Sequence, residues 1–226
     1  MSTNFTSNNY TVYENRSRDD MLPFVPESAH TVLEVGCSVG NFGSLLKSER
    51  SARVWGVEID PEAAAIASRR LDKVIVGPFG RNLNLPEGEF DCVLFNDVLE
   101  HMIDPYSALE YAKELLAKDG CVVASIPNVR YFGNVWRFLI DGTWEYVDAG
   151  ILDRTHLRFF TRKSIDSMFS NLGFEIREIK GINPVDSWDP PLRQKFRYLN
   201  FLLMKKIADM RWLQFAVVAT RNSQRG

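Results

Sequence analysis

The stretch Val32-Leu-Glu-Val-Gly-Cys-Ser-Val-Gly40 decides the fold of this chain. Its first residues are apolar and predict a short buried strand. The two glycines that follow, Gly36 and Gly40, predict a tight turn in which the backbone can approach a ligand without a Cβ in the way. The next residues repeat apolar side chains at helical spacing. A strand, a glycine loop and a helix in this order are typical of a nucleotide-binding site.

Short apolar runs alternate with helical patterns along the rest of the chain. The predicted strands cover residues 31–35, 54–59, 73–76, 90–95, 121–126, 174–179 and 213–220. Asp60-Pro61, Asp104-Pro105 and Thr161 mark the starts of three helices, because each places a capping side chain before the first helical residue. This alternation predicts an α/β protein with a largely parallel sheet and helices on both faces. Residues 129–160 and 182–212 break the alternation and are expected to be insertions after the fifth and sixth strands.

Length and composition indicate one globular domain spanning residues 1–226, with 45% apolar and 25% charged residues. The formal net charge of −2 gives no reason to expect nucleic-acid binding. Residues 1–16 are polar, lack an apolar signal core and are expected to be mobile, so a cytoplasmic protein is predicted. Cys37, Cys92 and Cys121 lie in apolar runs and are interpreted as buried free thiols.

An acid at the end of the second predicted strand indicates which nucleotide is bound. Glu58 follows Gly40 by eighteen residues, where a carboxylate can accept hydrogen bonds from both ribose hydroxyls. A dinucleotide would call for Gly-x-Gly-x-x-Gly in the first loop, and that spacing is missing. Glu34 stands two residues before the first glycine, and an acid there suits the cationic amino and sulfonium groups of S-adenosylmethionine (SAM). The pattern therefore favours SAM over NAD.

Four stretches together resemble the class I SAM-dependent methyltransferases, over about residues 30–180. They are Val-Leu-Glu-Val-Gly-Cys-Ser-Val-Gly, Val-Glu-Ile-Asp-Pro, Phe-Asp-Cys-Val-Leu-Phe-Asn-Asp-Val-Leu-Glu-His and Leu-Leu-Ala-Lys-Asp-Gly-Cys-Val-Val-Ala-Ser-Ile-Pro-Asn. The resemblance implies a Rossmann-like seven-stranded sheet of order 3-2-1-4-5-7-6 whose last strand is antiparallel. Matched by position, the implied cofactor-binding residues are Glu34, Gly36, Cys37, Gly40, Glu58, Ile59, Phe79 and Asn96.

The chain departs from this family pattern in two places. Ser38 stands where the first loop usually has another glycine, which narrows the backbone freedom of the loop. The acid that often follows the third strand is replaced by Gly77-Pro78-Phe79. Phe79 would pack on the adenine, whose amino group then needs a backbone carbonyl or water.

The segment from Val129 to Thr161 resembles a bacterial subgroup that often accompanies cell-surface polysaccharide and O-antigen synthesis. It resembles more loosely a small methyltransferase-like protein of methionine biosynthesis. The first likeness implies O-methylation of a sugar or polysaccharide precursor. Two further hypotheses stay open: a small-molecule O-methyltransferase of quinone or secondary metabolism, and a catalytically silent binding partner. Trp136 and Trp144 offer flat faces for a sugar, although such aromatics also serve as the core of an insertion.

Methylation of a hydroxyl needs a base near neutral pH, and histidine suits that role. His156, oriented by Asp153, is the first candidate, and His101 is the second; His156 as a plain loop residue is the alternative. Asp97-x-x-Glu100-His101 also resembles the Glu-x-x-Glu-His of methyltransferases that hold a divalent ion. In that alternative His156 would add a fourth ligand, and the set would suit magnesium or manganese. Because Leu-Glu-His followed by Asp-Pro is common in metal-free members, no metal is expected.

The end of the chain is basic. From Arg193 to Gly226 there are eight Lys or Arg residues and one acid, Asp209. Apolar residues at helical spacing predict a single helix over residues 192–212. This helix is expected to cover the sheet or to form the face of a homodimer. The mixture of apolar and basic residues also suits peripheral docking on an anionic membrane that carries a lipid-linked glycan.

Overall fold

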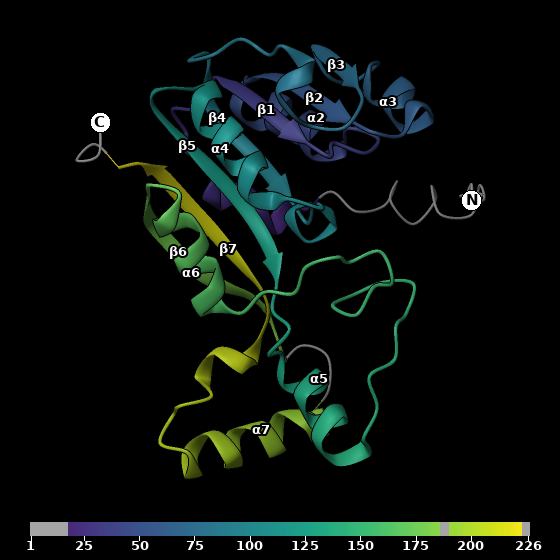
Figure 1. The fold of residues 1–226 in the computed structure, drawn as a ribbon, viewed down its shortest axis with the longest axis vertical. Helices are drawn as coiled ribbons and strands as arrows, with labels where there is room; N and C mark the ends of the chain where they lie inside the picture. Colours follow the sequence, from purple (N-terminus) through teal and green to yellow (C-terminus); the bar gives the residue numbers. More distant parts are fainter. Residues whose placement is uncertain (1–17, 186–189, 223–226) are drawn as a thin grey trace. The chain divides into compact units, whose positions relative to one another are not determined.

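The computed structural model describes residues 18–185 and 190–222. Its strands are β1 (Thr31–Val35), β2 (Arg53–Glu58), β3 (Lys73–Val76), β4 (Phe90–Asn96), β5 (Leu116–Pro127), β6 (Phe174–Pro184) and β7 (Trp212–Arg221). They form one sheet of order β3-β2-β1-β4-β5-β7-β6 (Figure 1). Strand β1 pairs in parallel with β2 and β4, whereas β6 and β7 pair antiparallel. The predicted strand order and the antiparallel last strand are thus confirmed.

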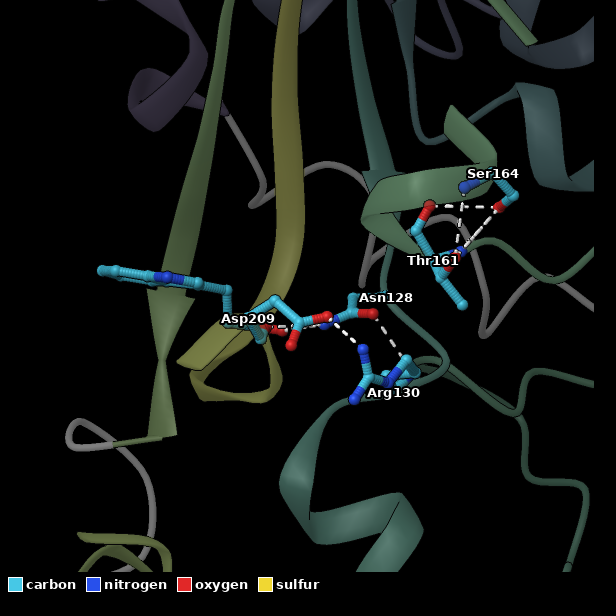
Figure 2. A network of polar contacts seen from close by, with 6 residues as sticks. Asn128, Arg130, Thr161, Ser164 and Asp209 are labelled. Carbon is cyan, nitrogen blue, oxygen red and sulfur yellow. Dashed lines mark hydrogen bonds and ion pairs between the residues drawn. The ribbon is translucent and has the colours of Figure 1, made fainter. Parts of the chain in front are cut away.

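The helices are α2 (Asn41–Arg50), α3 (Pro61–Ala67), α4 (Pro105–Leu115), α5 (Phe132–Trp136), α6 (Arg162–Asn171) and α7 (Pro190–Leu202). Helices α3, α4 and α6 begin where the sequence places capping residues. Asp60 accepts hydrogen bonds from the backbone N–H groups of Glu62 and Ala63 at the start of α3. Thr161 and Ser164 form a reciprocal capping box at the start of α6 (Figure 2). Short 3-10 segments lie at Asp19–Phe24, Arg81–Leu83, Leu99–His101 and Ala208–Arg211, and a π-helical turn lies at Arg137–Asp141.

The described part of the chain divides into two compact units. The first unit holds residues up to Asn96 together with Glu110–Val123, and the second holds Asp97–Leu109 and the residues from Ala124 onward. Helices α2 and α3 pack against β2 in the first unit, and α6 packs against β6 in the second. The single domain over 1–226 stays a prediction, and the segment 1–16 lies outside the described residues.

Each unit has its own apolar core. The first unit buries Val32, Leu33, Leu46, Val54, Phe90 and Phe95, and the second buries Ile165, Met168, Phe169, Phe215 and Val217. The three cysteines are free and buried, as predicted. No helix within the described ranges combines the length and the apolar character needed to cross a bilayer.

The excursion after β5 leaves and returns at one point, because Asn128 forms an isolated parallel bridge with Phe160. Within it, Trp136 packs beside Phe132 in a small apolar cluster with Phe196 of α7. Trp136 thus packs against the core of the insertion, one of the two roles left open for it, whereas the nearby Phe138 side chain is exposed.

The helix predicted over residues 192–212 is wrong in its second half. Helix α7 ends at Leu202, and the chain turns at Met204 and Lys205, which have φ angles of 51° and 63°. A right-handed helix cannot continue through two residues in the left-handed region. The chain resumes as a short 3-10 segment at Ala208–Arg211 before β7.

Candidate functional site

The glycine loop between β1 and α2 is tied to the end of β2 by its backbone. The N–H groups of Gly36 and Cys37 both donate to the carbonyl of Val57, at 2.8 and 3.2 Å. Gly36 and Gly40 have φ angles of 66° and 78°, which favour glycine. Ser38 also lies in the left-handed region, with φ of 48°. The serine that replaces a family glycine therefore keeps the loop conformation at some cost in backbone strain.

Three candidate residues lie in one row at the carboxyl ends of adjacent parallel strands. Val35 pairs with Val57 of β2 on one side and with Phe95 of β4 on the other. The residues that follow are Gly36, Glu58 and Asn96. This register brings together the parts of the site that the sequence predicted separately, all within the first unit.

Glu58 is held in place by two backbone donors. Its Oε2 accepts from the N–H of Ser38 at 2.7 Å, and its Oε1 accepts from the N–H of Asp60 at 3.0 Å. Each carboxylate oxygen retains a second lone pair, so both can still accept a hydroxyl hydrogen. Beside Glu58, the Ile59 side chain is 68% exposed and offers an apolar surface.

Glu34 and Asn96 are polar groups in need of partners. Glu34 is 3% exposed, and its Oε2 has no hydrogen-bond partner. Burial, which the backbone N–H of Gly43 only partly offsets, raises the pKa of Glu34 to about 8. Both polar atoms of the Asn96 amide are also buried without a partner. Each such group costs about 1–3 kcal/mol, so this region fits a ligand that brings polar or cationic groups of its own.

Cys37 and Phe79 face apolar surroundings. The Cys37 thiol is buried, and burial raises its pKa, so it is not a nucleophile. Only its backbone is available to a cofactor. The Phe79 ring contacts Phe95 and Tyr111, with centroids 5.7 and 5.2 Å away. Phe79 therefore has aromatic partners within its own unit, and its contact with adenine stays a prediction.

The second unit brings both candidate histidines together. The rings of His101 and His156 meet edge to face with centroids 4.6 Å apart. His156 Nε2 lies 4.0 Å from Oε1 of Glu100, and both side chains are buried. His101 lies in an exposed position. The sequence offered His101 and His156 as rival bases or, in the metal alternative, as joint ligands with Glu100. The structure places both histidines in one cluster with Glu100.

The role expected for Asp153 needs correction. His156 Nδ1 lies 2.9 Å from the carbonyl oxygen of Ile151, so a backbone group orients this ring. Asp153 Oδ1 instead accepts from the N–H and the hydroxyl of Thr155. The Thr155 hydroxyl oxygen lies 3.1 Å from His101 Nδ1. Asp153 therefore positions His101 through Thr155, a residue that sequence reasoning missed.

Asn128 is a second residue that sequence reasoning missed. Its side chain is fully buried, donates to the carbonyls of Asp209 and Trp212, and accepts from the N–H of Arg130 (Figure 2). Arg130 also forms an ion pair with Asp209 at 2.8 Å. This network ties the start of the excursion after β5 to the end of the segment that precedes β7. A polar residue directly after a buried strand was the signal for it.

A cavity of about 490 Å³ lies in the second unit beside α7. Its described lining includes three guanidinium groups and no carboxylate. The lining residues are Arg193, Phe196, Arg197, Asn200, Ala208, Arg211 and Trp212. Arginines beside an indole ring suit an anionic ligand with a flat or sugar-like part.

The chain matches the family model of the methyltransferase domain over residues 11–179. A ubiquinone biosynthesis O-methyltransferase of Psychrobacter arcticus is 31% identical over 163 residues, which cover 67% of this chain and 62% of that protein. An uncharacterized protein of Methanocaldococcus jannaschii is 30% identical over 144 residues, 63% of each chain. The chain therefore spans less than two thirds of these curated relatives.

The fold is shared with a solved methyltransferase in complex with the Trm112 methyltransferase activator from Haloferax volcanii. The TM-score is 0.68 at 18% identity, over 95% of this chain and 94% of that chain.

Proposed function

We propose that this chain, which belongs to the methyltransferase-domain family, methylates a hydroxyl oxygen of a sugar or polysaccharide precursor. SAM is the cofactor of this family. When bound, it supplies an electrophilic methyl group carried by its sulfonium. The observation that supports cofactor binding is the row of Gly36, Glu58 and Asn96 at the carboxyl ends of β1, β2 and β4.

The residues of the first unit fit this cofactor. Glu58 would accept from the ribose hydroxyls, because both of its oxygens keep a lone pair. Ile59 would pack against the adenine with its exposed side chain, and Phe79 is the further candidate for that contact. Glu34 and Asn96 have buried atoms without partners and would receive the amino group of the methionine part. The backbone of Gly36, Cys37 and Gly40 would line the cofactor site.

The acceptor is proposed to be anionic. The cavity lined by Arg193, Arg197 and Arg211 supports a phosphate-bearing precursor, since arginine binds phosphate oxygens in pairs. Trp212 in the same lining supports a sugar or base that stacks on it. A nucleotide-sugar or a lipid-linked glycan phosphate has both parts. Methylation of such a precursor is consistent with a cytoplasmic enzyme.

The base is proposed to come from the histidine pair. His156 is the first choice and His101 the second, with Asp153 acting on His101 through Thr155. His156→Ala is expected to keep SAM affinity and to lower turnover by about 10²-fold, the scale of a lost acid–base group. Turnover of His156→Ala at the wild-type rate would show that His156 is not the base and is only a loop residue.

A second candidate function is O-methylation of a phenolic small molecule. The identity of 31% with a ubiquinone biosynthesis O-methyltransferase favours it. A third, a catalytically silent partner with this fold, is opposed by the intact hydrogen bonds that present Glu58.

Two measurements test these proposals. Calorimetry with SAM is expected to show one site, weakened in Glu58→Ala and unchanged in the exposed control Glu62→Ala. Release of S-adenosylhomocysteine is then measured with nucleotide-sugars, lipid-linked glycans and dihydroxylated phenols in parallel. Turnover of the first two classes supports the proposal, and turnover of the phenols alone replaces it with the second candidate. An absence of SAM binding at millimolar concentration supports the silent partner.

A further inference from the structure

Three potential metal ligands converge in the second unit. Glu100, His101 and His156 each offer one ligand atom, and these atoms all lie within 4.8 Å of one another. The Glu100 and His156 side chains are 1% and 6% exposed. The cluster joins the short 3-10 segment after β4 to the loop before α6, so two distant parts of the chain build it.

The hydrogen-bond partners fix which ring nitrogens carry hydrogen. A carbonyl oxygen only accepts, so His156 Nδ1, at 2.9 Å from the carbonyl of Ile151, is the donor. His101 Nδ1 faces the carbonyl oxygen of Thr155 at 3.3 Å and also its hydroxyl, whose hydrogen goes to Asp153. Nδ1 therefore carries the hydrogen in both rings. In the neutral rings each Nε2 is then a bare lone pair.

One ligand atom from each of Glu100, His101 and His156 lies in the same small space. A cation placed there would be within reach of all three residues. A cation bound by all three groups needs no protonated ring.

The spacing of the ligand atoms also suits an ion. Two atoms that each lie about 2.1 Å from a shared ion are separated by about 3 to 4.2 Å, depending on the angle between them. His156 Nε2 and Glu100 Oε1 are 4.0 Å apart, too far for a direct hydrogen bond. The three ligand atoms lie within 4.8 Å of one another. A movement of about half an ångström would bring them to the separations expected around a shared ion.

We infer that Glu100, His101 and His156 form a binding site for a divalent first-row transition metal ion. Two imidazoles and one carboxylate favour Zn²⁺, Mn²⁺, Fe²⁺ or Co²⁺ over Mg²⁺, which prefers oxygen ligands. Asp97, which the sequence placed next to this set, is engaged elsewhere: its Oδ1 accepts from Ser125 and Gln214. The sequence led to the expectation that no metal binds, and this inference replaces that expectation.

Three protein ligands leave coordination positions for water or for an oxygen of a second molecule. His101 is exposed, so solvent reaches one member of the cluster. An ion there would lower the pKa of a bound hydroxyl as a Lewis acid, and the histidines would then be ligands and not bases. Metal binding itself does not depend on the proposed methyl transfer, and either can fail alone.

The test uses the full chain, stripped of metal with a chelator and titrated with Co²⁺ and Zn²⁺ by calorimetry and visible absorption. One ion per chain is expected, with a Co²⁺ absorption band that Zn²⁺ displaces. His101→Ala is the main variant, because this exposed residue can be lost without unfolding the chain. Its affinity should fall by more than about tenfold, since the loss of even an outer partner of a metal ligand costs that much.

Glu100→Gln should weaken binding in the same way and broaden or shift the Co²⁺ band. His30→Ala is the matched control, because His30 is the third histidine of the chain and lies outside the cluster. Unchanged affinity in this control supports the site. No stoichiometric binding to the wild type, or equal affinity in the wild type and His101→Ala, overturns the inference.

Discussion

Glu34→Gln is expected to change how the stability of the protein depends on pH. Glu34 is 3% exposed, and burial raises its pKa to about 8, above its ordinary value of 4.5. Between these two pKa values the folded chain holds a proton on Glu34 that the unfolded chain has released. Its contribution to stability is therefore present at low pH and is lost as the pH rises towards 8. The limiting slope for one proton is about 1.4 kcal/mol per pH unit.

Glutamine cannot ionise and keeps an oxygen for the N–H of Gly43, so the variant removes the titration and little else. Urea unfolding without SAM at pH 5.5 and pH 7.5 compares the wild type, Glu34→Gln and the exposed control Glu62→Gln. Over these two pH units the wild type should lose up to about 2–3 kcal/mol relative to Glu34→Gln. The control should follow the wild type. Parallel curves for the wild type and Glu34→Gln would show that Glu34 is already ionised at pH 5.5, and the reasoning would be wrong.

Three further predictions concern the cofactor, helix α2 and helix α7. Glu58→Ala should weaken SAM binding by about tenfold to a hundredfold in calorimetry, and an unchanged affinity in a folded variant would mean that the ribose lies elsewhere. Gly43→Ala should lower the free energy of unfolding by about 1–3 kcal/mol, because its Cβ would lie 2.6 Å from Leu71 Cδ2 and 2.9 Å from Glu34 Oε2. If Gly43→Ala unfolds at the same temperature as the wild type, helix α2 must move to accommodate the added Cβ without loss of stability. Phe201→Glu, at a side chain that is 80% exposed on α7, should abolish sedimentation with anionic vesicles at low salt; if the wild type does not sediment, the membrane role is lost.

Much of the fold could be predicted because its signals are local. Strands β1 and β3 begin and end where apolar runs meet polar residues or glycine, and their predicted bounds match the structure. Asp60 and Thr161 cap their helices as expected, since a capping side chain needs only the next three residues. The strand order came from the resemblance to a known family.

The errors arise where tertiary contacts decide the conformation. Apolar residues continue at helical spacing past Leu202, and neither Met204 nor Lys205 is a residue type that marks a turn. The sequence pattern therefore did not reveal where α7 ends. His156 is oriented by the carbonyl of Ile151, a backbone group that no side-chain pattern reveals. The rings of His101 and His156, 55 positions apart in the sequence, are in contact. The resemblance to metal-binding methyltransferases suggested that both could bind one ion, but no local pattern predicted the ring contact itself.

The burial of Cys37, Cys92 and Cys121 makes the native chain nearly silent to thiol reagents. A fluorophore or spin label could therefore be attached at one new surface cysteine, such as Ser48→Cys on α2, with the natural cysteines left in place. Slow modification of the natural thiols would in turn report local opening. Cys37 lies in the glycine loop, so its alkylation rate would measure how often that loop opens, and protection by SAM would appear as a slower rate.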